Sequence, residues 1–197
     1  RPMTSLFAWL MLMATRPFKI GDRIIIAGII GDVRDVTLMY VVLNQVGGTV
    51  ASEESTGRGV LIPNATLFDQ VIYNYTFESQ YILDEVPVRV TYKSDWETAE
   101  RILLTAAKEV TAAIMHATRT EPYIRAEFVP EGVLMRLRYE TEATRRPEIA
   151  TQIVKRIFHE FAKSDVVEFC LPQAEIAYRM KDSSPFFLPT AQTQEKK

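Results

Sequence analysis

Apolar residues crowd the first fifteen positions of the chain, and they predict a helix unlike any later element. From Leu6 to Ala14 no residue is charged, and the run ends at Arg16-Pro17. Proline disfavours helical backbone at the residue before it and has no N–H to donate, so we expect the helix to end there. The apolar residues lie nearly all the way round this helix, a surface that an isolated soluble domain cannot easily bury.

This apolar helix is too short to span a membrane alone. From Met3 to Thr15 it would be about 20 Å long, whereas a bilayer core is about 30 Å thick. Its carboxyl end is a poor signal-peptide cleavage site. We expect this helix to be the end of a longer hydrophobic element. It would pack against lipid or neighbouring subunits, because the later domains have their own elements to cover their sheets. The alternative is a short core helix or a helix at an oligomer interface. The residues of this expected membrane or pore helix are Leu6, Phe7, Trp9, Leu10, Met11, Leu12 and Met13.

Short runs of β-branched residues follow the helix and predict a small β domain. The first, "DRIIIA", lies between Gly21 and Gly28, as a short strand should. Others follow in "GDVRDVTL", "YVVL", "VLIPN" and "VIYNYT", with a long hairpin loop at Val46–Arg58. Strands at this spacing predict a five-stranded, strongly bent barrel from Phe18 to Thr76.

Beyond residue 80 the pattern alternates between strands and helices. The stretch "VPVRVTY" alternates as a strand with one apolar face. A helix capped by Ser94 or Asp95 should then run to about Thr118. Apolar residues recur along it in steps of three and four, which makes one continuous stripe. The members of this stripe are Trp96, Ala99, Leu103, Ala106, Val110 and Ala113.

The remaining elements complete an α/β unit. Two strands, "IRAEFV" and "VLMRLRY", are joined by a Pro- and Gly-containing turn, and a second helix starts near Pro147 with apolar residues at every fourth position. The stretches "VVEFCL" and "AEIAYRM" are predicted as closing strands. The order strand, helix, strand, strand, helix, strand is that of a ferredoxin-like unit. We therefore expect a sheet covered by two helices across Val86–Leu171.

The predicted fold class is α+β, in four parts. Residues 1–16 form the end of the hydrophobic helix, and residues 17–80 form the small β domain. Residues 81–173 form the ferredoxin-like α/β domain, and residues 174–197 add a C-terminal strand and a polar tail.

Composition narrows the class of protein further. A chain that is 47% hydrophobic and 24% charged is not disordered as a whole. Its net charge of −2 argues against a nucleic-acid partner, since such proteins usually carry a basic face. The single cysteine, Cys170, excludes an intramolecular disulfide framework and suits a reducing compartment.

The sequence contains no catalytic or metal-binding constellation. His116 and His159 fall on different predicted helices, without the clustered ligands that a metal site needs. Cys170 has no orienting third group for nucleophilic chemistry, so a buried structural thiol is the better interpretation. No glycine-rich phosphate loop follows a strand. We expect no catalytic residue, no metal and no cofactor.

Two further patterns have ordinary interpretations. Residues 64–66 and 74–76 match the N-glycosylation sequon, which is common by chance. Arg136 and Arg138 alternate along one predicted strand. They could line a water-filled space, but a solvated sheet face is the more common arrangement.

The segment from the end of the apolar helix through the β domain resembles the small-conductance mechanosensitive (MscS-like) channel family. "RPFKIGDRIIIAGIIGDVRDVTL" followed by "VLIPNATLFDQVIYNYT" carries that family's junction, glycines, I-P-N turn and last strand in the same order. The resemblance weakens over Val86–Met180, where the order of elements and "FCLPQ" still agree. The matching residues are Arg16, Pro17, Phe18, Gly21 and Asp22 at the helix–barrel junction, then Gly28, Gly31, Ile62, Pro63, Asn64, Asn74 and Tyr75.

The resemblance implies a membrane protein whose pore helix ends at Arg16. An Sm-like barrel and a ferredoxin-like domain would form a cytoplasmic vestibule, usually sevenfold, below the inner membrane. The partners would be further copies of the chain and the lipid bilayer, met by the N-terminal helix and by upstream segments. Such a channel opens on membrane tension and releases ions and small osmolytes under osmotic stress. Gly28 and Gly31 would serve tight turns in the barrel.

Two features depart from the family pattern, and two other functions stay open. The loop Val46–Arg58 is longer than the family's hairpin, and the apolar helix lacks the Gly/Ala spacing of closely packed pore helices. An Sm-like RNA-binding module would need a basic, aromatic-lined groove, which the acidic loop disfavours. A ligand-sensing ferredoxin-like domain would need a defined apolar pocket.

Overall fold

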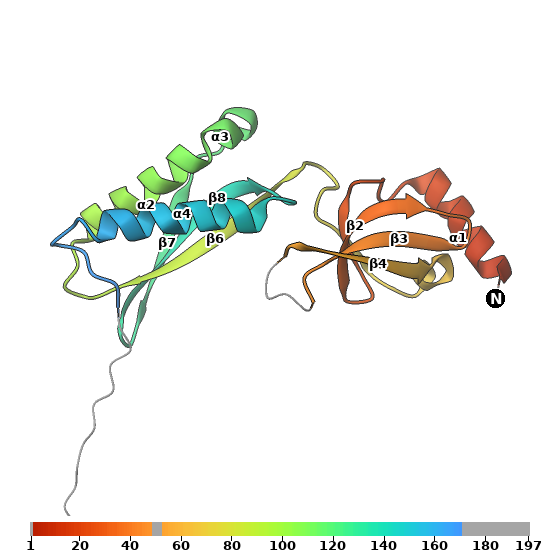
Figure 1. Ribbon diagram of the computed structural model, residues 1–197, viewed down its shortest axis with the longest axis horizontal. Helices are drawn as coiled ribbons and strands as arrows, with labels where there is room; N and C mark the ends of the chain where they lie inside the picture. The colour runs from red at the N-terminus through yellow and green to blue at the C-terminus, as the bar shows by residue number, and fades with distance from the viewer. Residues whose placement is uncertain (1, 49–52, 171–197) are drawn as a thin grey trace, which may run out of the picture.

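The computed structural model describes residues 2–48 and 53–170 of the 197-residue chain. These residues form two lobes, with an N-terminal helix on the outer end of the first (Figure 1). The β lobe lies within residues 17–74, and the α/β lobe lies within residues 81–170. Each lobe has its own cluster of buried apolar residues, and no residue belongs to both clusters. The fold is therefore α+β, with two separate sheets.

The β lobe is one antiparallel sheet that follows helix α1 (Pro2–Thr15). Its strands are β1 (Arg23–Ile26), β2 (Ile29–Val36), β3 (Tyr40–Val46), β4 (Ser55–Pro63) and β5 (Ile72–Asn74), with the 3-10 helix η1 (Asn64–Phe68) between the last two. They pair in the order β4-β3-β2-β1-β5. Five strands agree with the prediction. Within these pairings β4 and β5 are edge strands, so closure into a barrel stays a prediction.

The hairpin between β3 and β4 is shorter than predicted. Instead of a loop over Val46–Arg58, β4 already begins at Ser55, which pairs with Val46. The ladder is irregular here, because its register shifts near Val46 and Gly57 takes a left-handed φ of 71°. Asn44 Nδ2 donates to Ser55 Oγ at 2.7 Å. Polar and glycine residues thus carry this part of the strand, where the prediction relied on apolar alternation.

The two glycines of the β1–β2 hairpin act differently. Ala27 and Gly28 form the two-residue turn, with φ of 51° and 78°, a conformation that favours glycine. The expectation that Gly31 also serves a turn is wrong, because Gly31 lies within β2 and faces β3. A Cβ there would lie 2.8 Å from Leu43 Cβ and 3.0 Å from Asn44 O. Glycine is required at this position so that two strands can approach closely.

The α/β lobe is a three-stranded antiparallel sheet with helices on one face (Figure 1). Its elements are β6 (Tyr81–Val90), α2 (Trp96–Val110), α3 (Ala112–Thr118), β7 (Tyr123–Val129), β8 (Gly132–Glu142) and α4 (Arg146–Phe161). The strands pair in the order β6-β8-β7, and α2 and α4 pack together over them. The four-residue repeat of α4 is confirmed, since Ile149, Ile153, Ile157 and Phe161 are all buried.

The single helix predicted up to Thr118 is in fact two helices. Asp95 caps α2 as predicted, because its Oδ2 accepts a hydrogen bond of 2.9 Å from the backbone N–H three residues later. The break falls at Thr111, whose hydroxyl donates to Ala107 O at 2.8 Å and competes with the backbone ladder. The break also shifts the apolar stripe, so that Ile114 is buried and Ala113 is exposed.

The sheet of the α/β lobe starts earlier than predicted. The first strand begins at Tyr81 rather than Val86, because β8 is long enough to pair with these extra residues as far as Glu142. Tyr92, the last residue of the stretch "VPVRVTY" predicted as a strand with one apolar face, lies beyond the end of β6 and is exposed. Its hydroxyl instead donates to Val129 O at 2.7 Å, which ties the end of β6 to β7.

The end of the sheet is also shorter than predicted. The strand predicted at "VVEFCL" is wrong for its described residues, where Phe169 makes an isolated bridge to Val90. Val166 O accepts a 2.8 Å hydrogen bond from Asp95 N at the start of α2. The described part of this segment meets the end of β6 only through the bridge to Val90, where Cys170 N donates to Arg89 O at 2.9 Å and Thr91 N donates to Glu168 O at 3.1 Å. The predicted strand "AEIAYRM" lies outside the described residues.

We predict that Gly31→Ala lowers the free energy of unfolding of the β lobe by about 1–3 kcal/mol, because the new methyl group overpacks the β2–β3 contact. Gly59→Ala in β4 is the matched control, since an added Cβ there meets nothing within 4 Å. Urea denaturation followed by circular dichroism measures both. Equal losses in the two variants would contradict the close-approach account.

Candidate functional site

Helix α1 has two unlike faces. One face is buried, and Leu12 on this face belongs to the apolar core of the β lobe. The helix packs there against η1. Trp9 and Met11 lie at the boundary between the two faces. The buried residues are Ser5, Ala8 and Leu12, and the exposed apolar face consists of Met3, Leu6, Phe7, Leu10 and Met13, each between 41% and 71% exposed.

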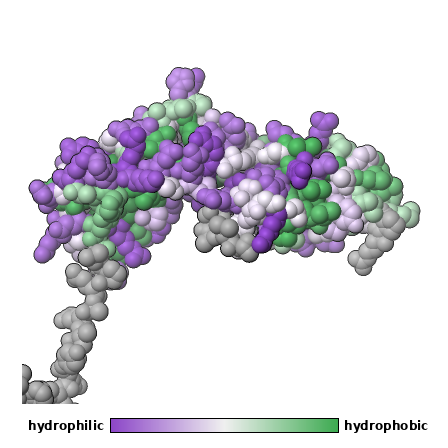
Figure 2. All heavy atoms as spheres, in the orientation of Figure 1, coloured by the Kyte–Doolittle hydropathy of each residue, from purple (hydrophilic) through white to green (hydrophobic). Residues whose placement is uncertain are grey.

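One face of α1 therefore packs against the β lobe. The expectation that the helix would pack only against lipid or neighbouring subunits is wrong for this face. Ser5 and Ala8 are small enough to let the helix lie close, and Leu12 fills the space beside Phe18. The exposed apolar face gathers at the outer end of the β lobe (Figure 2). Among the described residues, no helix has both the length and the apolar character needed to cross a membrane.

The helix ends where the sequence predicted. Arg16 leaves the helical conformation with a left-handed φ of 46°, and its N–H donates to Leu12 O at 2.9 Å. Pro17 follows and cannot continue the helix. Phe18 then enters the core of the β lobe, where it is 7% exposed. A left-handed arginine is unfavourable by itself, so the flanking anchors Leu12 and Phe18 hold this turn in place.

Asp22 connects the segment that follows α1 to the last strand of the β lobe, β5, and to the residues just beyond it. This carboxylate is buried at 4% exposure. Its Oδ2 accepts hydrogen bonds from Lys19 N and Asn74 Nδ2, both at 2.9 Å, and its Oδ1 accepts from Thr76 Oγ1 at 2.9 Å. Asn74 Nδ2 also donates to Pro17 O at 3.1 Å. We call these five residues the junction network.

The junction network explains two motifs that the sequence placed far apart. Gly21, with a φ of 94°, makes the turn that brings Asp22 back toward the helix end. Asn74 closes β5, and its Oδ1 accepts from Thr76 N at 2.9 Å, which fixes the amide orientation. Sequence reasoning named Asp22 and Asn74 but missed Thr76. The only available signal was the "NYT" triplet, which it interpreted as a chance sequon.

Asn64 fixes the turn on which α1 rests. Pro63 precedes η1, and Asn64 is fully buried. Its Nδ2 donates to Thr37 O at 2.9 Å and to Leu38 O at 3.0 Å, which ties η1 to the β2–β3 turn. The side chains of both sequon asparagines, Asn64 and Asn74, are thus engaged inside the fold, as expected for chance matches.

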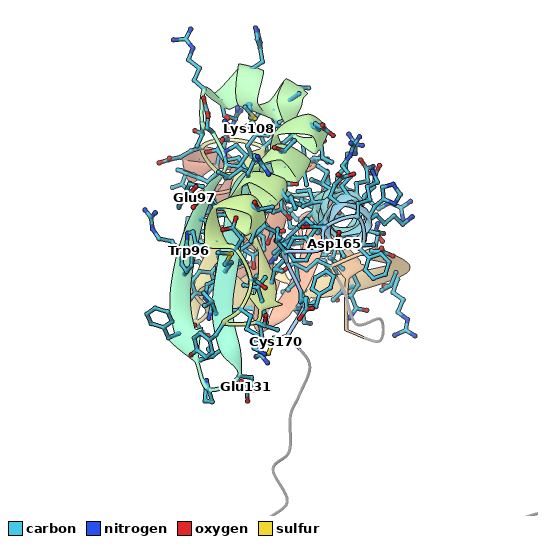
Figure 3. The ribbon with its side chains drawn as sticks, turned by 90° about the vertical axis from the view of Figure 1, so that its left-hand side faces the viewer. Trp96, Glu97, Lys108, Glu131, Asp165 and Cys170 are labelled. Carbon is cyan, nitrogen blue, oxygen red and sulfur yellow. The ribbon has the colours of Figure 1, made fainter. Side chains whose placement is uncertain are left out.

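The structure does not bring the histidines and the cysteine together. His116 and His159 are exposed on α3 and α4. Cys170 is half-buried rather than buried as predicted, and its Sγ donates to Glu131 O at 2.8 Å (Figure 3). In the described ranges no group of three or more His, Cys, Asp or Glu side chains could hold a metal ion.

Arg136 and Arg138 lie on the outer face of the α/β sheet in a paired network of charges. Arg136 contacts Glu127 at 2.7 Å and Glu85 at 3.0 Å, and Arg138 contacts Glu85 at 3.2 Å. The hydrogen bond from Arg136 lowers the pKa of Glu85, and the bond to Glu127 raises the pKa of Arg136. All four side chains are partly exposed, so the pairs contribute little stability and the face is solvated.

Comparison with known proteins gives one family and one fold. The family model for the mechanosensitive ion channel β-domain matches residues 1–77. The structure is similar to Helicobacter pylori MscS in its closed state, with a TM-score of 0.70 and 20% identity over 91% of this chain and 66% of that one. It is also similar to Arabidopsis thaliana MSL1, with a TM-score of 0.57 and 16% identity over 86% of this chain and 59% of that one. No curated protein sequence matches.

The two solved structures share the α+β fold of this chain. The chain spans 66% of the length of the first and 59% of the length of the second. Residues 1–77, which include α1, the junction network and every strand of the β lobe, match the mechanosensitive ion channel β-domain family. The resemblance seen in the junction motifs is therefore confirmed.

We predict that Asp22→Ala lowers the free energy of unfolding of the β lobe by about 3 kcal/mol, because three donors lose their one buried acceptor. Asp69→Ala, at an exposed position just after η1, is the matched control and should change it by less than about 0.5 kcal/mol. Chemical denaturation measures the difference. A small loss in Asp22→Ala would show that the junction network does not hold the helix end.

Proposed function

We propose that this chain is the vestibule-forming part of a mechanosensitive channel that opens on membrane tension and releases ions and small osmolytes. In this proposal the β lobe is an Sm-like barrel, and the α/β lobe is a ferredoxin-like domain. Copies assemble as a homo-oligomer, sevenfold as in the family, on the cytoplasmic side of the inner membrane. The chain is not an enzyme and uses no metal or cofactor.

The observation that carries the proposal is the exposed apolar face of α1. Met3, Phe7 and Leu10 are 71%, 60% and 49% exposed, although the other face of the same helix is buried. Covering one large apolar side chain gains about 1.5–3 kcal/mol. Five such residues on one helix face therefore favour a lipid or a neighbouring subunit as the surface that covers them.

A channel helix also needs a rigid connection to the parts that it moves. Force applied to α1 reaches the β lobe through Leu12, Phe18 and the junction network. This network joins the segment after α1 to β5 by hydrogen bonds to Asp22. A displacement of the helix end cannot be absorbed locally without breaking hydrogen bonds to the buried carboxylate of Asp22. The lobe and the helix would therefore move as one body when membrane tension changes.

The RNA-binding alternative is less well supported. An RNA-binding Sm-like barrel needs a basic, aromatic-lined groove. The chain has a net charge of −2, and Arg23 of the β lobe is buried and paired with Asp32. An apolar groove of about 420 Å³ beside Phe158 and Phe169 could admit a small molecule, which keeps ligand sensing as the second candidate. The one charged side chain lining it, Arg89, gives little basis for orienting a ligand.

The channel proposal predicts tension-gated current. The natural gene product that carries this chain is expressed in spheroplasts of a bacterial strain lacking mechanosensitive channels, and excised patches are placed under graded suction. We expect step-like currents above a threshold pressure. Absence of such currents, with the protein shown by immunoblot to be in the membrane, would overturn the proposal.

The exposed face of α1 predicts detergent-dependent association of the chain. We expect Leu6→Ser, Phe7→Ser and Leu10→Ser, combined, to give a folded protein whose size in light scattering no longer depends on detergent, because the apolar face is gone. The control is Leu12→Ser, which should destabilise the β lobe because Leu12 is 3% exposed. Unfolding of the triple variant would contradict the assignment of this face as an outer surface.

A further inference from the structure

The two lobes are held together by polar contacts rather than by a shared apolar core. Their buried apolar clusters have no common member. A cleft of about 430 Å³ lies between them, lined by Lys19 and Glu78 on one side and Glu142 on the other. The relative position of the lobes therefore depends on the chain connection between β5 and β6 and on a few hydrogen bonds.

Arg23 provides the first of these hydrogen bonds. It is 1% exposed at the start of β1 and forms a bidentate pair with Asp32, with Nε to Oδ1 at 2.8 Å and Nη2 to Oδ2 at 3.1 Å. Its remaining nitrogen, Nη1, donates to Ala143 O at 2.6 Å and to Glu53 O at 3.3 Å. Ala143 follows β8, so a β-lobe arginine binds the backbone of the α/β lobe.

Glu53 provides the second link, from the β3–β4 hairpin. Its Oε1 accepts from Arg146 Nη1 at 2.8 Å, across the lobe boundary. Arg146 also contacts buried Asp84 at 2.7 Å, and Asp84 accepts from Tyr139 OH at 3.0 Å. The bond to Asp84 raises the pKa of Arg146, and burial raises the pKa of Tyr139, so the arginine stays charged and the tyrosine stays protonated. We call Arg23, Asp32, Glu53, Asp84 and Arg146 the interlobe cluster.

The chain connection between the lobes has a short free part. On one side Thr76 is fixed to the β lobe through Asp22. On the other side Gln80 O accepts from Ala143 N at 3.0 Å and belongs to the α/β lobe. Residues 77–79 lie between these two attachments, outside any helix or strand. They are the place where backbone rotation would change the angle between the lobes.

We propose that the interlobe cluster is a conformational lock that sets the angle between the lobes. With Glu53 on Arg146 the α/β lobe is held at one angle. When this pair opens, the hydrogen bond from Arg23 Nη1 to Ala143 O remains, and the lobe rotates about that bond and residues 77–79. The β3–β4 hairpin has this role because it carries Glu53. Arg146 keeps its bonds to Asp84 after the pair opens, so each lobe stays folded.

The test measures the distance between the lobes in the chain itself and does not depend on channel activity. Spin labels are attached to Asp69→Cys in the β lobe and Lys155→Cys on α4, both exposed positions, in a Cys170→Ser background. Labelled chain is diluted with unlabelled chain, and double electron–electron resonance gives the distance distribution. Glu53→Ala is compared with Glu54→Ala, an exposed neighbour in the same hairpin.

We expect Glu53→Ala to widen the distance distribution at least twofold, with Glu54→Ala indistinguishable from the parent. Glu53→Gln, which keeps an acceptor without the charge, should give an intermediate width. Unchanged width in Glu53→Ala, with a native circular dichroism spectrum, overturns the proposal. If Glu53→Ala unfolds, Glu53→Gln decides: a widened distribution supports the lock, and an unchanged one overturns it.

Discussion

One buried carboxylate, that of Asp22, holds the parts of this structure on which the functional account depends. It accepts hydrogen bonds from the chain just after α1 and from side chains at and just beyond β5, the last strand of the β lobe. A buried charge is tolerated only when its acceptors are satisfied, so the helix end, β1 and β5 must keep their relative positions. The direction in which α1 leaves the lobe, and the face that it exposes, follow from this requirement.

A second constraint acts between the lobes. Because their apolar cores are separate, the hydrophobic effect stabilises each lobe but does not fix the angle between them. That angle is set by directional contacts, chiefly those of Arg23 and Glu53. A protein built in this way can keep both lobes intact while their arrangement changes.

Local signals in the sequence predicted much of this fold. The four-residue repeat of α4, the cap at Asp95 and the stop at Arg16-Pro17 each depend on neighbours within one turn, so they could be recognised directly. The same holds for the junction motifs that identified the family. What failed depended on distant or competing partners. Arg23 can be buried because its side chain donates to the carbonyl of Ala143, 120 positions away in the sequence. Leu12 is buried where α1 packs against η1. The break at Thr111 arises because a side-chain bond competes with the helix.

The central claim is that α1 is fastened to the β lobe on one face and covered by lipid or by another subunit on the other. The most direct measurement is the accessibility of single spin labels to a water-soluble nickel reagent, in the natural gene product reconstituted into vesicles. The account predicts low accessibility for labels at Phe7 and Leu10, and high accessibility for a label at Asp69 on the outside of the β lobe. Labels at Phe7 and Leu10 as accessible as the one at Asp69 would contradict it.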